Sequence, residues 1–250
     1  MFSINDNTLL PKACVSGGVR DCEAGGQSPQ VSILMPIYNG SEFLPESVSS
    51  VIQQTFTDWE LLIAINGYDE PENTIYKMVR DYIKAIGDIR IKVLDYYDCK
   101  GKAATLNKML GECQYPYVAI LDVDDIWLPD KLAAQQPFIK KGYDVVGTKC
   151  VYFGEMNNII PDIPTGNIST FKFLQVNPII NSSVVIRKEL AHWEPACFLE
   201  DYDLWLRLWK EQRHFYNCHE VLVKHRIHKA SAFNAKGNNN GVEALRLKYI

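Results

Sequence analysis

Three aspartates stand together where an apolar stretch of the chain turns acidic. The segment YVAILDVDD (117–125) ends in Asp122, Asp124 and Asp125. Carboxylates at the end of a buried strand repel one another, and a divalent cation relieves that repulsion. Oxygen ligands suit Mg²⁺ or Mn²⁺, whose coordination is usually completed by substrate phosphates. The cluster therefore predicts a metal and phosphate site, against the simpler alternative of a cap for the helix expected after Pro129.

A second acidic group opens the amphipathic helix expected over residues 199–212, with Glu200, Asp201 and Asp203 in its first turn. A carboxylate in such a place can act as a general base toward a hydroxyl group. Acids also suit the positive end of a helix dipole without any chemistry, and Asp203 is spaced to pair with Arg207 one turn later. Taken alone, this group favours the structural interpretation.

Basic residues complete the set of polar candidates. Lys100 and Lys102 precede or open a helix expected over 100–113, where they can offset phosphate or carboxylate charge, although lysines at such positions are commonly solvated. Arg226 and His228 share one face of the last expected strand, an arrangement that suits a charge clamp on phosphate.

Alternating strands and helices must position these residues. The first half predicts strands over 31–39, 58–67, 90–96 and 117–125, separated by helices over 41–56, 71–87 and 100–113. Such alternation is typical of parallel βαβ units with both sheet faces covered, and open α/β sheets bind ligands beyond the carboxyl ends of their strands. The second half predicts strands over 144–154 and 220–228, a strand leading into a helix over 180–193, and the helix over 199–212.

Composition narrows the classes of function. The chain has 250 residues, 47% of them apolar, and a net charge of −4, which gives no basic footprint for nucleic acid. No GxGxxG follows a strand, which argues against a dehydrogenase, and seven cysteines without a CxxC pair give no support for a zinc site. No signal peptide and no run of about 20 apolar residues is present, so we expect a cytoplasmic protein that reaches a lipid acceptor only by visiting the membrane surface.

Five segments together resemble the inverting glycosyltransferases of family 2. They are, in the order and spacing of that family, VSILMPIYNG, DWELLIAING, GKAATLN, LDVDDIWLPDKL and LEDYDLWLRL, and the match covers roughly residues 31–230. The resemblance implies an α/β fold of the GT-A type: a Rossmann-like, mixed and mostly parallel sheet flanked by helices.

Composition at the two ends and the motifs between them predict a division of the chain. Residues 1–30 are expected to be a flexible leader and 31–232 the GT-A domain, with a nucleotide-binding half over 31–125 and an acceptor half over 126–232. Residues 233–250, rich in Asn and Gly at their start, are expected to form a mobile tail or a lid over bound sugar nucleotide.

In this family the turns after the first two strands contact the nucleotide. Here they place Pro36, Tyr38 and Asn39 against it, although Asn39 also suits a helix cap. The second strand usually ends in an aspartate that accepts a hydrogen bond from uracil, and this chain has Asn66 there, with Asp69 as a substitute nearby. An amide oxygen still accepts that bond, but its NH₂ group can read another base edge, so the identity of the base stays open.

The remaining roles follow the same resemblance. We expect Lys102 to lie near the base and ribose, and Asp122 and Asp124 to position the ribose or a nearby lysine. Asp125, with help from Asp124, is expected to bind Mn²⁺ or Mg²⁺. His228 is a third candidate metal ligand.

The implied reaction is a direct displacement in which a sugar passes from a nucleoside diphosphate, expected to be UDP, to the hydroxyl of a glycan, glycolipid or protein. Asp201 matches the family's catalytic base and Glu200 is the alternative. Two other functions stay open: a nucleotidyltransferase, and a non-catalytic module that binds nucleotide sugars or carbohydrate.

Overall fold

A computed structural model describes residues 30–228 and 239–250 of the chain. Its centre is a nine-stranded sheet with the order β3-β2-β1-β4-β8-β6-β9-β5, and β7 pairs with β9 beside this path. The strands are β1 (Val31–Ile37), β2 (Trp59–Asn66), β3 (Ile91–Tyr96), β4 (Tyr117–Ile120), β5 (Ile126–Trp127), β6 (Val145–Gly154), β7 (Gly166–Asn167), β8 (Val185–Arg187) and β9 (Phe215–Ile227).

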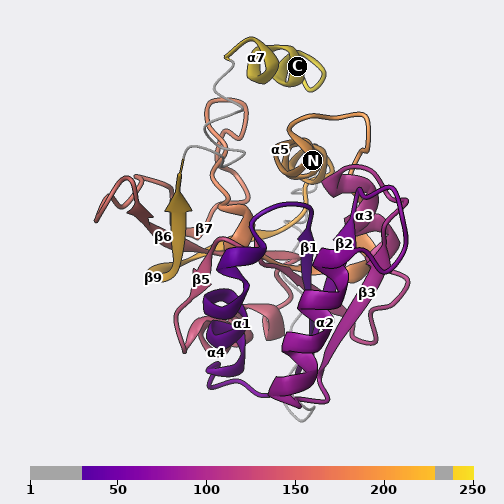
Figure 1. The fold of residues 1–250 in the computed structure, drawn as a ribbon. Helices are drawn as coiled ribbons and strands as arrows, with labels where there is room; N and C mark the ends of the chain where they lie inside the picture. Colours follow the sequence, from indigo (N-terminus) through magenta and orange to yellow (C-terminus); the bar gives the residue numbers. More distant parts are fainter. Residues whose placement is uncertain (1–29, 229–238) are drawn as a thin grey trace, which may run out of the picture.

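Helices connect these strands and cover both faces of the sheet (Figure 1). The helices are α1 (Leu44–Ile52), α2 (Thr74–Ile86), α3 (Lys102–Met109), α4 (Lys131–Lys140), α5 (Glu200–Lys210) and α7 (Asn239–Leu247), and the short 3₁₀ turns are η1 (Ser41–Phe43), η2 (Asn181–Ser183) and η3 (Lys188–Leu190).

The first half of the sheet is parallel and the second half is mixed. Strands β3, β2, β1 and β4 run parallel. Strand β8 then lies antiparallel to both β4 and β6, while β6 and β9 form the longest parallel pair. Most paired residues thus lie in parallel pairs, and the predicted mixed, mostly parallel α/β sheet is confirmed.

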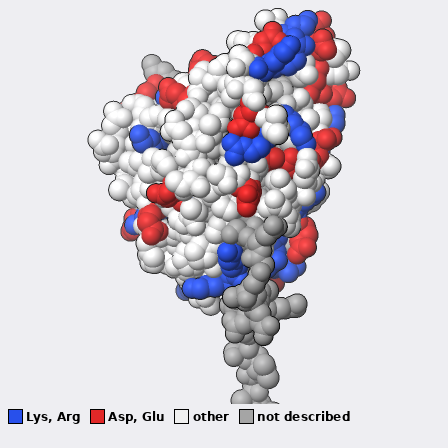
Figure 2. Space-filling view, turned by 90° about the horizontal axis from the view of Figure 1, so that it is seen from below, with Lys and Arg blue, Asp and Glu red and all other residues white. Residues whose placement is uncertain are grey.

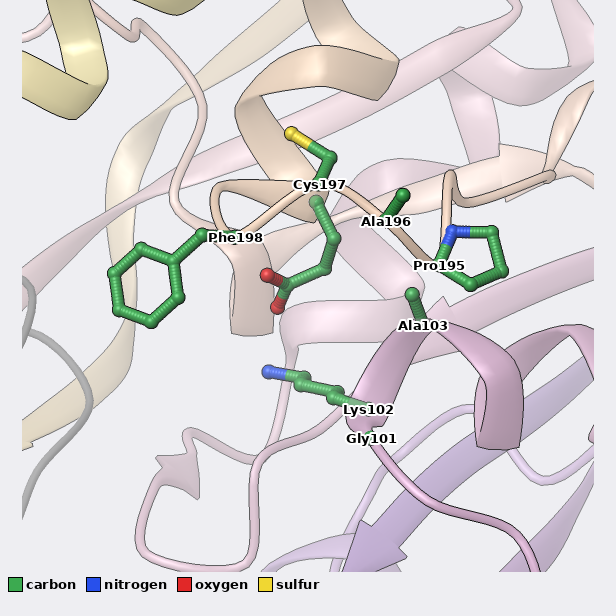
Figure 3. Close-up of a pocket in the computed structure, with 8 residues that line it drawn as sticks. Gly101, Lys102, Ala103, Pro195, Ala196, Cys197 and Phe198 are labelled. Atoms are coloured by element: carbon green, nitrogen blue, oxygen red, sulfur yellow. The ribbon is translucent and has the colours of Figure 1, made fainter.

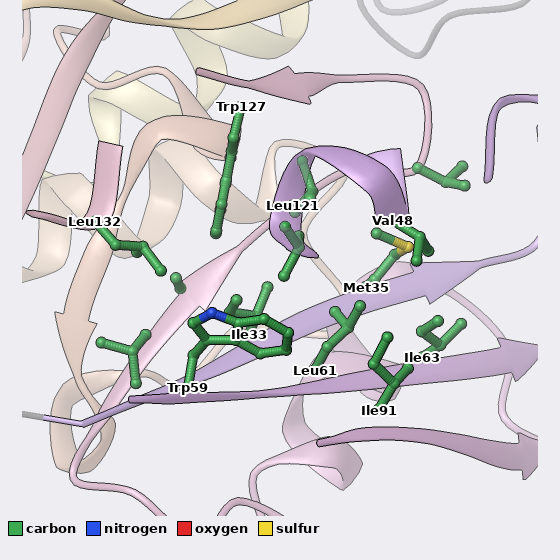
Figure 4. Close-up of a cluster of buried hydrophobic side chains, with 14 of the residues drawn as sticks. Ile33, Met35, Val48, Trp59, Leu61, Ile63, Ile91, Leu121, Trp127 and Leu132 are labelled. Atoms are coloured by element: carbon green, nitrogen blue, oxygen red, sulfur yellow. The ribbon is translucent and has the colours of Figure 1, made fainter. Parts of the chain in front are cut away.

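Alternation along the strands divides the core into two layers. Ile33 and Met35 on β1 face the layer that holds α1, α2 and α4, together with the buried indole rings of Trp59 and Trp127 (Figure 4). Leu34, between them, faces the layer that holds α3, α5 and α7. Successive side chains of a strand point to opposite faces, so a continuous apolar run such as VSILMPI can serve both layers.

Helix α2 shows how local sequence sets an element's bounds. The Asn73 side chain accepts a hydrogen bond of 3.0 Å from the Tyr76 amide at its start, and Gly87 ends it in the left-handed conformation, with φ at 72°. Both are ordinary helix-end devices, and the prediction that Gly87 stops this helix is confirmed.

Strand β4 is shorter than the sequence predicts. It was expected to run from 117 to 125 but ends at Ile120, and a turn follows in which the Asp125 amide donates to the Asp122 carbonyl at 3.0 Å. Asp122 and Asp124 therefore lie on a turn rather than on one face of a strand.

The helix expected near residue 190 is also wrong. Only the 3₁₀ turn η3 follows β8. Trp193 lies outside any helix, and Asn107 binds its backbone: the Asn107 side chain accepts from the Trp193 amide at 2.9 Å and donates to the Trp193 carbonyl at 2.6 Å. Those two bonds replace helical ones, so tertiary contacts override a local helical pattern.

The ends of the chain were expected to be a leader and a mobile tail. Residues 1–29 and 229–238 lie outside the described residues, whereas residues 239–247, part of the expected tail, form α7 above α5 (Figure 1). Leu245 of this helix is 3% exposed and packs in the same layer as α5, so this part of the tail is a docked helix.

The surface gives one further observation. On the face seen from below, Lys and Arg side chains are interspersed with Asp and Glu (Figure 2). No helix in the described part of the chain is long and apolar enough to cross a bilayer.

Candidate functional site

The polar candidates gather at the carboxyl edge of the parallel strands. Tyr38 and Asn39 follow β1, Asn66 ends β2, and Asp122 follows β4. Strand β1 pairs with β4 only as far as Leu34, because β4 leaves the sheet after Ile120. Pro36, which has no amide proton to donate, lies just past that divergence, where no partner on the β4 side requires one. The polar candidates therefore lie beyond the carboxyl ends of the parallel strands, where α/β sheets bind their ligands.

Asp122 forms a fixed ion pair with Lys102. The lysine ammonium donates to Asp122 Oδ1, and Asn181 Nδ2 donates to Asp122 Oδ2 at 3.3 Å. Burial opposes ionisation of both partners, but their mutual attraction outweighs it, so the pKa of Lys102 is raised and that of Asp122 is lowered. The direct ion-pair partner of Lys102 is therefore Asp122 of the acidic turn.

Asp125, the expected main metal ligand, faces the protein interior instead. Its side chain is fully buried, with one oxygen 3.0 Å from His225 Nδ1 and the other accepting from the Arg226 amide at 2.9 Å. Burial alone would lower the pKa of His225, but the Asp125 carboxylate raises it to about 9. The histidine therefore stays protonated at neutral pH, and the contacts of Asp125 tie the turn to the end of β9, a role that the sequence prediction missed.

Asp124 is the member of the cluster that combines solvent access with an adjacent ligand group. Its side chain is 23% exposed, and Oδ2 lies 3.0 Å from Nε2 of His228, also 23% exposed. Burial and the nearby carboxylates of Asp125 and Asp122 raise the pKa of Asp124. This is the electrostatic situation that a bound cation relieves.

A complete protein cage for a metal is not present. Among residues 30–228 and 239–250, no three His, Cys, Asp or Glu side chains group as metal ligands. Magnesium in particular is often held by one or two carboxylates plus substrate phosphates. Asp124 and His228 fit such an incomplete set, and the buried Asp125 does not.

Arg226 is not the phosphate clamp that its spacing suggested. Its side chain is 14% exposed, its Nε donates to the Asp124 carbonyl at 2.9 Å, and its Nη2 donates to Glu46 at 2.5 Å. The guanidinium also lies between the rings of Phe43 and Phe153, at 4.5 and 4.3 Å from their centroids. Through its Nε and Nη2 bonds and its two ring contacts, Arg226 links η1 and α1 to the acidic turn.

Tyr38 is placed where a base can stack. Its side chain is 55% exposed, and its ring lies 5.8 Å from that of Tyr68. Gly67 makes this possible because its φ is +80° and because a Cβ there would come within 2.9 Å of Tyr38 Cδ2. The Asn-Gly turn thus has both the conformational role noted in the sequence and a steric one.

The other nucleotide candidates are placed differently. The turn after β1 begins at Gly40 without a side-chain cap, so Asn39, which is exposed, does not cap it. Asn66 is 3% exposed, and its Nδ2 lies 3.5 Å from the Cys99 carbonyl. Asp69 is exposed in the turn after Asn66.

A cavity of about 440 Å³ separates α3 from the loop before α5. Lys102 and Ala103 line one side, and Pro195, Cys197 and Phe198 line the other (Figure 3).

The first turn of α5 borders this cavity. Glu200, 7% exposed, lines it, and Asp201 is half-buried on the next residue. Both carboxylates act on the Lys102 ammonium electrostatically, in addition to Asp122. The fold therefore brings the acidic turn and the first turn of α5 to one lysine.

Several residues of the site could not be predicted from local sequence. His225 was not among the residues that the sequence analysis singled out, and its contact with Asp125 spans 100 residues of the chain. Asn181, Glu46 and Phe43 lie far from the acidic turn along the chain, and only the fold brings them to it.

Similar proteins agree with this architecture. The structure resembles a mannosyltransferase from Pyrobaculum calidifontis in complex with GDP-Man and Mn²⁺, with a TM-score of 0.63, 16% identity and coverage of 82% of this chain and 59% of that one. It also resembles TarS 1–349 from S. aureus in complex with UDP-GlcNAc, with a TM-score of 0.66, 13% identity and coverage of 84% and 61%. This chain spans about three fifths of each of those chains. These likenesses identify the GT-A fold.

Sequence relatives identify the family. The chain is 30% identical over 234 residues to the putative glycosyltransferase EpsE of Bacillus subtilis, covering 88% of this chain and 81% of the relative. It is 30% identical over 218 residues to WfgD of Escherichia coli, named as a UDP-Glc:alpha-D-GlcNAc-diphosphoundecaprenol beta-1,3-glucosyltransferase, covering 82% and 80%. The model of glycosyl transferase family 2 matches residues 32–189. This chain is therefore a glycosyltransferase of family 2.

Proposed function

We propose that this glycosyltransferase inverts the anomeric carbon of a sugar that it moves from UDP to a hydroxyl acceptor, in the synthesis of a polysaccharide or glycoconjugate. The observation that carries the proposal is the position of Lys102. Its ammonium is paired with Asp122 of the acidic turn and is also within the electrostatic reach of Glu200 and Asp201. A donor diphosphate at the turn and an acceptor at α5 would thus meet on opposite sides of this lysine.

The donor end of the site has an incomplete metal set. Asp124 and His228 would hold Mn²⁺ or Mg²⁺, and a bound cation would neutralise charge on the departing diphosphate. Lys102 adds a fixed positive charge beside the turn, and its raised pKa keeps it protonated at neutral pH.

The acceptor end supplies the base. In a direct displacement the acceptor hydroxyl attacks from the face opposite the leaving diphosphate, and a carboxylate removes its proton. We assign that proton transfer to Asp201, which is half-buried at the start of α5. Glu200 is the alternative base, and its place in the cavity wall beside Lys102 favours a role in holding that lysine.

Uridine is the base that we propose for the donor. Tyr38 offers an exposed ring for stacking, and Asn66 has its Nδ2 toward the Cys99 carbonyl, which leaves its Oδ1 to accept from the uracil N3–H group. WfgD is named for UDP-Glc and TarS was solved with UDP-GlcNAc, whereas the mannosyltransferase was solved with GDP-Man. The sugar and the acceptor are to be found by experiment.

The test is a panel of nucleotide sugars, each incubated with the chain with and without Mn²⁺. Thermal stabilisation that requires both metal and one donor, followed by release of UDP, supports the proposal. With pyrophosphate added, formation of UTP and a sugar 1-phosphate would identify a nucleotidyltransferase. Donor binding with no release of UDP, even when hydroxyl acceptors are added, would identify a non-catalytic module. Either result overturns the proposal.

The base is tested with Asp201→Asn, which should lower kcat by roughly 10² to 10⁴-fold. Asp98→Asn is a matched control, because Asp98 is exposed and pairs only with Lys108 at 3.4 Å. If Asp201→Asn transfers sugar at the rate of the control, the assignment is wrong.

A further inference from the structure

Helix α7 lies directly on the helix that carries the proposed base. In Figure 1 it sits above α5. Leu245, the buried residue of α7, packs in the same layer as Tyr202 and Phe173. Leu247 and Ile250 on the same segment are 70% and 84% exposed, so only one side of α7 is used for docking.

Two polar contacts fix this docking at the first turn of α5. The Tyr249 hydroxyl donates to Asp203 Oδ1 at 2.9 Å. Arg246 Nε donates to the Tyr202 hydroxyl at 3.1 Å, and that hydroxyl in turn donates to the Phe173 carbonyl. Tyr202 and Asp203 directly follow Asp201 in the chain, so both contacts hold residues that are next to the proposed base.

The hydrogen bond between Tyr249 and Asp203 lies at a buried carboxylate. Asp203 is 5% exposed, and Tyr202 is 3% exposed. Burial and the Asp203 carboxylate raise the pKa of Tyr249, so its hydroxyl stays protonated and remains a donor. A buried carboxylate that loses such a donor leaves an acceptor without compensation.

The first turn of α5 has little local support of its own. Its N-cap residue is Leu199, and no side chain caps the helix there. Helix ends without caps fray, because their first amide groups have no intrahelical acceptors. Three acidic side chains also crowd this turn, and the helix dipole only partly offsets their repulsion.

We infer that α7 and the residues just after it form a positioning element of the reaction site. Arg246 of α7 and Tyr249, two residues beyond its end, hold the first turn of α5 and thereby aim the Asp201 carboxylate at the acceptor. The inference rests on the proposed function, because it needs Asp201 to act on the acceptor. From the sequence we expected this segment to be a mobile tail or lid, whereas its described part contacts the first turn of α5. Misplacing a catalytic group by about 1 Å can lower a rate by roughly 10²-fold.

The experiment uses the full chain with Tyr249→Phe, which removes one oxygen atom. UDP release from the UDP-sugar that the panel identifies is measured together with donor binding. We expect kcat to fall roughly tenfold, since one positioning contact of two is lost, while the donor KM and the donor-dependent thermal shift stay unchanged. Arg246→Gln should likewise lower kcat while leaving the donor KM and the donor-dependent thermal shift unchanged.

Two variants separate positioning from general stability. Asp203→Asn keeps an oxygen that accepts from Tyr249 and should retain most of kcat, whereas Asp203→Leu should behave like Tyr249→Phe. Tyr82→Phe is the matched control, since Tyr82 lies on α2 in the other core layer.

The outcomes distinguish this inference from the proposed function. Unchanged kcat in both Tyr249→Phe and Arg246→Gln, with Asp201→Asn inactive, overturns the role of α7 alone. Full activity of Asp201→Asn overturns the proposed base. Equal losses of kcat and donor binding in Tyr249→Phe would show that α7 only stabilises the fold. An effect of Tyr249→Phe that vanishes in an Asp201→Asn background supports the inference.

Discussion

Asp125→Asn separates a structural role of the acidic turn from metal binding. The amide keeps an oxygen that accepts from the Arg226 amide, but it removes the charge that faces His225. In the native protein the pKa of His225 is raised from 6.5 to about 9. That rise in the pKa of His225 corresponds to about 3 kcal/mol of stability.

The pH dependence gives this prediction its sign. A histidine whose folded pKa is raised contributes its full stability below pH 6.5 and loses it as the pH rises through about 9. Asp125→Asn should therefore destabilise the protein most near pH 6, by about 2 to 3 kcal/mol more than at pH 10, since Asp122 and Asp124 still act on His225. At pH 7.5 the pH-dependent loss should be about 2 kcal/mol.

The assay is urea unfolding followed by tryptophan fluorescence at pH 6, 7.5 and 10, with a chelator present so that bound metal does not contribute. Asp124→Asn is the matched control: it should lose Mn²⁺-dependent donor stabilisation, whereas Asp125→Asn should keep it. An equal loss of stability by Asp125→Asn at pH 6 and pH 10 would refute the charge pair. If Asp125→Asn loses the Mn²⁺-dependent stabilisation by donor and Asp124→Asn keeps it, Asp125 is the metal ligand.

Three further substitutions test other parts of the structure. Lys131 is fully buried, with its Nζ 2.9 Å from Gln135 Oε1 and its pKa far below the usual value, so Lys131→Met should raise the free energy of unfolding at pH 7 in a denaturant titration. That gain should shrink as the pH approaches 10.5, because only the unfolded state binds a proton in this range, and a gain that grows with pH would contradict it. Gly67→Ala forces a Cβ to within 2.9 Å of Tyr38, and should weaken UDP binding in calorimetry by roughly tenfold; unchanged affinity would remove Tyr38 from the base site. Arg226→Lys loses the stacked, forked guanidinium, so it should lower thermal stability by a few degrees and raise the donor KM, whereas an effect on kcat alone would speak against its fastening role.

Much of the fold was readable because its signals are local. The apolar runs of β1 and β2, the glycine that ends α2, and the acidic first turn of α5 each depend on residues within one element. Periodicity and end signals therefore predicted these elements. The helix expected near residue 190 failed, because Asn107 binds the Trp193 backbone from 86 residues away.

The candidate site, too, has features that the local sequence predicts and features that depend on distant segments. The sequence by itself determined that acids follow β4 and open α5, and the order of the motifs identified the family. Only the tertiary structure decided the partner of each carboxylate: Asp125 is buried against His225, Asp122 pairs with Lys102, and the partly exposed Asp124 lies beside His228. Neighbouring aspartates are chemically identical along the chain. Their roles differ because burial and partners from distant segments set the charge and accessibility of each one.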